Sequence, residues 1–305
     1  MNASKTTASA PLFILGSPRS FTSVICAMLG QHPAHYGVPE LNLFIEPDMR
    51  RLWLRLTGQR QFMMHGLLRA IAQIYAGEQT LASIDLARRW ILRRLSRTTG
   101  EVYRELAIRV SPLRIVDKSP VYCASPRYLR RIAETFPEAC YIHLVRHPRT
   151  QGESLLRLNP LLAAMENAYD YSTLPPTLDP QVTWCRTQSH ILAFLADIPW
   201  ERQRTIRGED LLNDPESHLR MCATWLGVAD SPEAMEAMLH PEASPYASLG
   251  PFGAHLGNDI NFLKDPRFRP GRITASSLVG LLPWRSDGRG FNPQTLQLAE
   301  RLGYV

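Results

Sequence analysis

Short apolar runs rich in β-branched and aromatic residues alternate along this chain with longer segments whose apolar positions repeat at helical spacing. The short runs have the length and composition of strands that are buried on both faces of a sheet. They lie at 12–16, 113–116, 139–145 and about 204–206. Helical patterns lie at 20–30, 126–136, 181–197 and 215–226. This alternation predicts an α/β fold with a central parallel sheet flanked by helices, and it places ligands at the carboxyl ends of the strands.

Two long segments depart from that alternation. Residues 40–110 predict a helical insertion, and residues 241–293, rich in proline and glycine, predict long, lid-like loops over the sheet. One helix face of the insertion is formed by Leu67, Leu68, Ile71, Ile74 and Tyr75. The 305 residues, 45% of them hydrophobic, are enough for one substantial core. We therefore expect a single domain over 1–305 with a flexible N-terminus at 1–10.

The first predicted strand runs into a turn that carries one cation and three hydroxyl groups, on Arg19, Ser20, Thr22 and Ser23. Backbone N–H groups and the dipole at a helix start attract anions, and these side chains add further donors. The turn thus predicts a site for a phosphate-like or sulfate-like group. It is not an ATP-type P-loop, because it lacks the Gly-Lys pair of that motif. The alternative is an ordinary strand-to-helix turn capped by Ser17 or Ser20.

A second candidate anion site follows the strand at 139–145. Arg146 stands at the end of that strand, Pro148 suits the first turn of a helix, and Ser154 lies about two turns beyond Arg146. A guanidinium at a strand end and a hydroxyl on the next helix can together hold an anion. The alternative for Arg146 is an ion pair with a nearby carboxylate.

In this order and at this separation, the two segments resemble the motifs of sulfotransferases that use PAPS, the 3′-phosphorylated adenylyl sulfate donor. The resemblance spans roughly residues 11–230 and implies a three-layer P-loop-like fold. It also implies that the first turn cradles the 5′-phosphosulfate, and that Arg146 and Ser154 grip the 3′-phosphate. The first motif is matched by Pro18, Arg19, Ser20, Thr22 and Ser23. Phe21 stands where the family usually has glycine. Three alternatives are open for Phe21: it has ordinary helical dihedrals, it pushes the donor aside, or it faces the acceptor pocket.

Sulfuryl transfer is an in-line displacement in which positioning and charge stabilisation supply most of the catalysis. Lys118 directly follows the strand at 113–116. Members of the family often have Lys-Ser or Lys-Thr at the matching position, and the resemblance implies that Lys118 stabilises the charge of the leaving group. The alternative is that Lys118 pairs with Asp117 or another carboxylate.

An alcohol acceptor must also lose a proton, so a base is needed. Glu40 is the first candidate, because its segment resembles one in tyrosylprotein-type and polyketide-associated sulfotransferases whose glutamate is the base; a helix-start glutamate is the alternative. His255, on a glycine-rich loop that can close over the site, is the second candidate. We interpret His143, inside a predicted strand, as a core residue, and His147 as a structural donor.

The acceptor is indicated only by short segments. Residues 39–43 and 257–263 look closest to the sulfotransferase domains of curacin-type polyketide synthases, which sulfate a β-hydroxyl on a carrier-protein-bound acyl chain. The expected partner is therefore a small molecule with a hydroxyl group or an acyl-carrier-protein-tethered chain. Four arginines form either a docking patch for an acidic partner or a solvated face: Arg88, Arg89, Arg93 and Arg94.

Two more segments bear on the donor. Residues 207–210 match the family's Arg-Tyr-Glu-Asp segment with Gly208 in place of tyrosine, so a stacking contact near the adenine is missing or comes from another aromatic residue. Arg267, Arg269 and Arg272 either clamp the 3′-phosphate or are solvated loop charges.

Charge and composition exclude some classes. With 34 basic and 28 acidic residues the formal charge is +6, which suits an anionic donor, but no zinc-finger spacing or long basic tract indicates a nucleic-acid-binding protein. Five dispersed cysteines, no signal peptide and no bilayer-length apolar run predict a cytoplasmic protein without a membrane span. We expect no metal, and PAPS as the donor with PAP as its product. The alternatives are a nucleotide-binding protein without transfer activity and a small-molecule kinase; the oligomeric state is not indicated.

Overall fold

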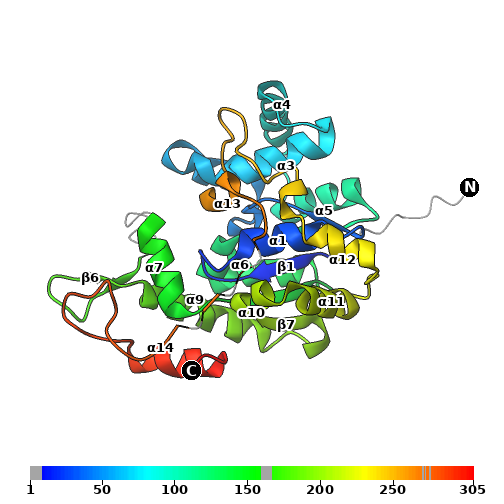
Figure 1. The fold of residues 1–305 in the computed structure, drawn as a ribbon. Helices are drawn as coiled ribbons and strands as arrows, with labels where there is room; N and C mark the ends of the chain where they lie inside the picture. Colours follow the sequence, from blue (N-terminus) through cyan, green and yellow to red (C-terminus); the bar gives the residue numbers. More distant parts are fainter. Residues whose placement is uncertain (1–8, 159–166, 270, 272, 275) are drawn as a thin grey trace, which may run out of the picture.

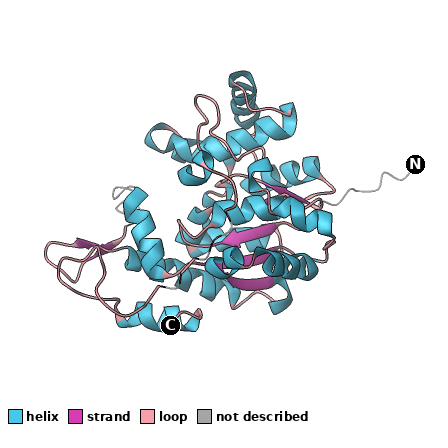
Figure 2. Ribbon diagram, in the orientation of Figure 1, coloured by secondary structure: helices cyan, strands magenta, loops and turns pink. Residues whose placement is uncertain are grey.

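Five parallel strands form the central sheet of the computed structural model, which describes residues 9–158, 167–269, 271, 273–274 and 276–305. Their order across the sheet is β2-β3-β1-β4-β7. The strands are β1 (Leu12–Leu15), β2 (His35–Gly37), β3 (Arg114–Asp117), β4 (Cys140–Val145) and β7 (Gln203–Arg207). Helices cover both faces of the sheet (Figures 1 and 2), so the predicted α/β fold with a central parallel sheet flanked by helices is confirmed.

The helices follow the strands in alternation. The helices that lie between the strands of the sheet, or follow its last strand, are α1 (Thr22–Gly30), α6 (Pro126–Thr135), α7 (Pro148–Leu158), α9 (Pro180–Leu195), α10 (Gly208–Asn213), α11 (Pro215–Leu226) and α12 (Pro232–Met238). The C-terminal part contains α13 (Ile260–Lys264) and α14 (Pro293–Arg301). A small antiparallel pair is formed by β5 (Tyr169–Asp170) and β6 (Thr177–Leu178). Within the described ranges, no helix is both long enough and apolar enough to cross a membrane.

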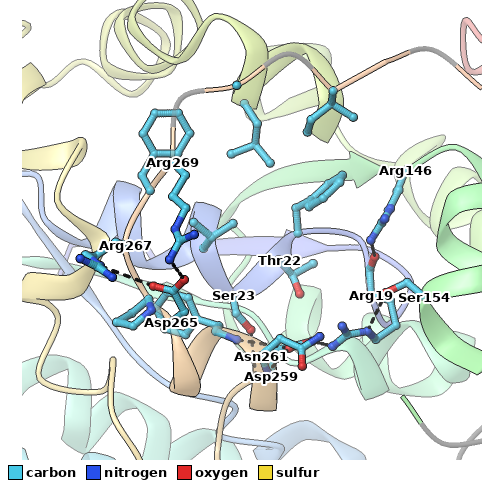
Figure 3. A pocket seen from close by; sticks show the side chains of 18 residues that line it. Arg19, Thr22, Ser23, Arg146, Ser154, Asp259, Asn261, Asp265, Arg267 and Arg269 are labelled. Carbon is cyan, nitrogen blue, oxygen red and sulfur yellow. Dashed lines mark hydrogen bonds and ion pairs between the residues drawn. The ribbon is translucent and has the colours of Figure 1, made fainter. Parts of the chain in front are cut away.

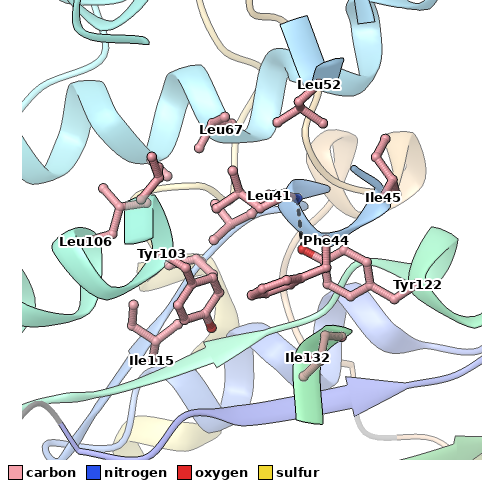
Figure 4. Packing of buried hydrophobic residues seen from close by; sticks show 14 of the residues in the cluster. Leu41, Phe44, Ile45, Leu52, Leu67, Tyr103, Leu106, Ile115, Tyr122 and Ile132 are labelled. Atoms are coloured by element: carbon pink, nitrogen blue, oxygen red, sulfur yellow. Dashed lines mark hydrogen bonds between the residues drawn. The ribbon is translucent and has the colours of Figure 1, made fainter. Parts of the chain in front are cut away.

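Alternate residues of β1 point to two different cores, as expected for a strand buried on both faces. Phe13 and Leu15 belong to the larger core, beneath α3 (His65–Ala76), α5 (Thr99–Val110) and α6. Leu12 and Ile14 belong to the second core, beneath α1 and the helices α10 to α12. Figure 4 shows the larger core, where rings such as Phe44, Tyr103 and Tyr122 pack against leucines of the insertion.

Residues 40–110 are largely helical. Besides α3 and α5 they contain α2 (Met49–Leu56) and α4 (Leu81–Leu92), with short 3₁₀ turns between them. Leu67, Leu68 and Ile71 of the expected helix face are buried, but Tyr75 is 39% exposed and packs its ring against Trp90.

Residues 35–37 form β2, a strand of the sheet that the hydrophobic pattern of the sequence did not indicate. The strand has three residues, His-Tyr-Gly, and it pairs with β3 alone at the sheet edge, through contacts such as Gly37 with Val116. A three-residue strand with one aromatic and no aliphatic side chain gives no apolar run, which is why the hydrophobic pattern did not indicate it.

The described part of 241–293 consists of long loops interrupted by a 3₁₀ turn (Pro241–Ala243) and α13. Arginines of the helices donate hydrogen bonds to backbone carbonyls of these loops. Arg69 of α3, only 1% exposed, donates to the carbonyls of Ser248 and Leu256 at 2.8 and 3.1 Å. Arg149 of α7 donates to the carbonyls of Ser277 and Leu281 at 2.9 and 2.7 Å. The expectation of a flexible terminus at 1–10 falls almost wholly outside the described residues.

Candidate functional site

The turn between β1 and α1 presents donors toward a cavity. Arg19 and Phe21 both have left-handed backbone, with φ of 69° and 62°. Phe21 is the N-cap of α1 and gives no side-chain cap, so the first N–H groups of the helix have no capping side chain. The hydroxyl of Ser20 is buried without a hydrogen-bond partner among the described residues. The left-handed φ of Phe21 shows that one alternative from the sequence, ordinary helical dihedrals at this residue, was wrong.

Arg146 lies beside this turn, because β4 pairs with β1 and the carboxyl ends of parallel strands meet. Its Nη1 donates to the carbonyl of Arg19 at 2.7 Å, and its Nε donates to the hydroxyl of Thr150 at 3.2 Å. Burial lowers the pKa of Arg146 to about 10. Among the residues that the structure describes, no carboxylate lies within 4.0 Å of this guanidinium, so the ion-pair alternative for Arg146 is not what the structure shows.

Arg19, Arg146 and Ser154 line one cavity of about 400 Å³ (Figure 3). Ser154 of α7 accepts a hydrogen bond from Nε of Arg19 at 3.2 Å. Phe21, Thr22 and Ser23 of the first motif line the same cavity, whereas Ser20 lies buried behind it. The structure thus brings together six of the seven residues that the sequence indicates for donor binding.

The opposite wall of the cavity comes from described residues between Asp259 and Ile273. Of these, Arg267 and Arg269 were alternatives from the sequence for clamping the 3′-phosphate, whereas Asp259 was not assigned to the site. The carboxylate of Asp259 forms an ion pair with Arg19, and its backbone N–H donates to the hydroxyl of Ser23 at 3.1 Å. Arg267 and Arg269 also line the cavity, and both are paired with Asp265 (Figure 3). Arg272 lies outside the described residues. Asp259 was visible in the sequence within the segment 257–263, but nothing there showed that its carboxylate meets the first turn.

Glu40 and Lys118, the candidate base and the candidate charge stabiliser, are each other's partners. Nζ of Lys118 donates to Oε1 of Glu40 at 2.6 Å. The lysine side chain is 1% exposed and the glutamate side chain is 29% exposed. The buried ammonium therefore has its counter-charge, and the carboxylate remains accessible from one side. The predicted alternative that Lys118 pairs with a carboxylate is confirmed, with Glu40 and not Asp117 as the partner.

The pair sits beside the donor cavity without lining it, and a short loop joins the two. The N–H of Glu40 donates to the carbonyl of Gly257 at 2.7 Å, two residues before Asp259. Gly66 of α3 lies against the backbone of Glu40, and an added Cβ at Gly66 would overlap the Glu40 carbonyl. One loop therefore contacts both the Glu40 backbone and the Arg19 guanidinium.

A buried network fixes the chain after Glu40. Asp117 accepts hydrogen bonds from the hydroxyls of Ser119 and Tyr122, at 3.1 and 3.3 Å. The same hydroxyls accept from the backbone N–H groups of Asn42 and Leu43. Burial raises the pKa of Asp117 to about 7, against the opposing effect of these two hydrogen bonds. The segment that carries the candidate base is therefore held by the segment that carries Lys118.

The candidate histidines occupy other positions. His255 is exposed, with its Nδ1 at 3.1 Å from the carbonyl of Gly250, and it does not line the cavity. His143 is fully buried at 2.6 Å from Gln188, and His147 accepts from the N–H of Arg149. Burial lowers the pKa of both His143 and His147 to about 4. Of the predicted bases, Glu40 is the one that lies against Lys118.

Three of the four arginines at 88–94 that the sequence indicated as a docking patch or a solvated face are engaged within the chain. Arg89 pairs with Asp85, and Arg94 pairs with Glu105 while stacking on Trp90. Arg88 donates to the carbonyl of Gly253 at 3.0 Å.

Among the described residues, no group of three or more histidine, cysteine, aspartate or glutamate side chains is placed to hold a metal ion.

The model of the sulfotransferase family matches residues 11–232, more than half of the chain. The chain belongs to the sulfotransferase family. Among solved structures, this sulfotransferase is similar to the sulfotransferase domain from the curacin biosynthetic pathway, with a TM-score of 0.77 and 26% identity over 97% of this chain and 98% of that one. It is similar to the sulfotransferase domain from the Synechococcus PCC 7002 olefin synthase, with a TM-score of 0.74 and 26% identity over 100% and 98% of the two chains. A comparison with curated protein sequences found no match.

These similarities cover nearly the whole chain, including the segment beyond residue 232 that the family model does not match. The predicted kinship with polyketide-synthase-associated sulfotransferases is confirmed, and so is the P-loop-like fold. Sulfotransferase STF9 from Mycobacterium avium shares the fold, with a TM-score of 0.51 and 16% identity over 98% of this chain and 78% of that one. Membership of the sulfotransferase family and the two similar sulfotransferase domains support a transferase enzyme.

Proposed function

We propose that this sulfotransferase moves a sulfuryl group from PAPS to the hydroxyl of an acyl chain tethered to a carrier protein, or of a small molecule. The observation that carries the proposal is the shared cavity of Arg19 and Arg146. Two guanidinium groups from neighbouring strand ends, with the start of α1 between them, suit a ligand that has anionic groups at two separate points.

The residues present fit such a donor. The start of α1 has no capping side chain, the Ser20 hydroxyl has no partner among the described residues, and Arg146 has no carboxylate within ion-pair distance there. Buried donors of this kind are normally satisfied, so each of them favours an anionic ligand. Phe268 adds an apolar surface that suits a purine base. Arg19, Thr22 and Ser23 would hold the 5′ end of PAPS, and Arg146 with Ser154 its 3′-phosphate. When bound, PAPS supplies the activated sulfuryl group.

The chain's own residues then handle the proton. The partly exposed carboxylate of Glu40 accepts the proton of the acceptor hydroxyl. Protonation removes the counter-charge of Lys118, whose ammonium is buried. An ammonium that has lost its partner in a buried setting attracts negative charge that develops beside it. The 2.6 Å contact thus couples removal of the proton to stabilisation of the leaving group.

A tethered acceptor is supported by two observations. Residues 39–43 and 257–263, which resemble curacin-type domains, form the hydrogen bond between Glu40 and Gly257 beside the base. The two similar solved domains come from a curacin biosynthetic pathway and an olefin synthase, and the similarity extends over nearly their full length.

Titration with PAP tests the donor assignment. We expect PAP to bind without added metal, and Arg146→Ala to weaken PAP binding by roughly ten- to a hundredfold, since a hydrogen-bonded charge is lost. Binding of 5′-AMP, which lacks the 3′-phosphate, should change little in the same variant. Equal losses for both nucleotides would remove Arg146 from the 3′-phosphate.

Turnover assays separate the alternative functions. The transferase should form sulfated product from PAPS without metal and should transfer nothing from ATP with magnesium. A protein that binds PAP but transfers to no hydroxyl acceptor, small or carrier-bound, would be a nucleotide-binding module. Transfer from ATP would identify a kinase.

The ion pair of Asp259 with Arg19 has its own consequence. An anionic donor must compete with this carboxylate for the guanidinium. We expect Asp259→Asn to tighten PAP binding by roughly tenfold, because the competing charge is gone. Asp85→Asn is the matched control, since it removes the same charge from a surface pair with Arg89. Calorimetry compares the two, and weaker PAP binding in Asp259→Asn would show that the carboxylate organises the cavity instead of competing for it.

A further inference from the structure

The side chain of Phe21 occupies a position that its backbone makes costly. Its φ of 62° and ψ of 9° lie in the left-handed region, which glycine adopts freely and bulky residues rarely adopt. Phe21 is also only partly buried at the rim of the donor cavity. A strained backbone persists only where the surrounding structure holds it, and such positions are concentrated at functional sites. The contacts of the Phe21 ring therefore indicate what holds this residue in place.

The ring has one neighbour over its face and another at its edge. The guanidinium carbon of Arg146 lies over its face, 4.2 Å from the centroid. A Cβ built on Gly208 would lie 2.6 Å from Cδ2 of the ring and 3.5 Å from both Cγ and Cε2. Both ring neighbours of Cδ2 are farther from that Cβ by most of a C–C bond length, which places the Cβ close to the plane of the ring, outside its edge. The edge of Phe21 therefore abuts Gly208 while its face carries Arg146.

The ring of Phe21 is one of the few groups that hold the guanidinium of Arg146 in place. Among the described residues it has no carboxylate partner, and its bonds to the Arg19 carbonyl and the Thr150 hydroxyl engage only Nη1 and Nε. A ring beneath a guanidinium attracts it and limits its tilt, while the remaining N–H groups stay free for an anion. By contrast, Arg19 is held by Asp259.

We propose that Phe21 is a positioning residue that orients Arg146 for the 3′-phosphate, and that Gly208 is its matched partner, kept free of a side chain so that the ring can lie there. This inference rests on the proposed PAPS dependence. It also accounts for two departures from the sulfotransferase motifs, namely Phe21 in place of glycine and Gly208 in place of tyrosine. The aromatic ring comes from position 21, and the glycine at position 208 leaves room for it.

The ligand-free part of the test is a double-mutant cycle on stability. Gly208→Ala should lower Tm, because its methyl group can be accommodated only if the ring edge shifts and disturbs the contact with Arg146. The same substitution in a Phe21→Gly background should have little effect, since no ring is then present. Equal effects of Gly208→Ala in both backgrounds would overturn the match between positions 21 and 208, whether or not the protein binds PAP.

The ligand-binding part uses Phe21→Leu, which keeps a side chain with the same backbone requirement but removes the aromatic face. Calorimetry should show PAP binding weakened by about tenfold, with 5′-AMP binding changed less than twofold, since only PAP has the 3′-phosphate. A purely structural role would weaken both nucleotides equally or lower Tm alone, and either result would overturn the proposal. If the wild type does not bind PAP, the proposed donor is wrong, and this outcome is distinct from a normal PAP affinity in Phe21→Leu.

Discussion

Glu40→Gln is expected to bind PAP as the wild type does and to turn over between about 10² and 10⁴ times more slowly. The amide oxygen can still accept the hydrogen bond from Lys118, so the local geometry is kept, but it cannot take the proton of the acceptor. The residue also stands outside the cavity that contains Arg19 and Arg146, so donor affinity should not depend on it. Product formation by mass spectrometry and PAP titration measure the two quantities separately.

The control for this prediction is His255→Gln, which removes the other candidate base. That side chain is exposed and bonded to the Gly250 carbonyl, so we expect turnover within about twofold of the wild type. The reverse pattern, with normal turnover in Glu40→Gln and a large loss in His255→Gln, would assign the base to the loop histidine.

The two guanidinium groups could be predicted from the sequence because each follows a buried, apolar strand. Arg19 comes after β1 and Arg146 after β4, and the pattern of apolar residues marks the ends of both strands. Parallel strands place their carboxyl ends at one edge of the sheet, so the two side chains were expected to be neighbours. The pairing of β1 with β4 and the shared cavity agree with that expectation.

The contact between Glu40 and Lys118 could not be predicted, although both residues were singled out. Their meeting depends on β2, since Glu40 follows β2, Lys118 follows β3, and the two strands pair in parallel. The missing element was a three-residue edge strand without an apolar run. Without it, the sequence offered Asp117 or another carboxylate as the partner of Lys118 and did not single out Glu40.

The position of Asp259 against the first turn could not be predicted for a different physical reason. Its place is set by bonds that cross large sequence separations, such as those from the buried Arg69 to the carbonyls of Ser248 and Leu256. An arginine on a helix is normally solvated, and a loop rich in proline and glycine has no period that reports its neighbours. The conformation of Phe21 was open for a similar reason, because the space beside Gly208 exists only in the folded chain.

Lys118→Met is expected to separate activity from stability. Turnover should fall by about 10²- to 10³-fold, the usual cost of losing a group that stabilises developing charge. Stability should stay within about 1 kcal/mol of the wild type or rise, because an apolar side chain of similar length replaces an ammonium that is 1% exposed, and Glu40 can be hydrated.

Glu40→Gln, unlike Lys118→Met, should lower the stability of the protein. It leaves the buried ammonium without its counter-charge, so the free energy of unfolding should fall by on the order of 1–3 kcal/mol. The double variant Glu40→Gln/Lys118→Met should regain that stability while remaining inactive. Denaturant unfolding and turnover of the three variants test the coupling. Near-normal turnover in Lys118→Met would show that the lysine serves only to hold Glu40, and additive losses of stability would show that the two charges do not compensate each other in the folded protein.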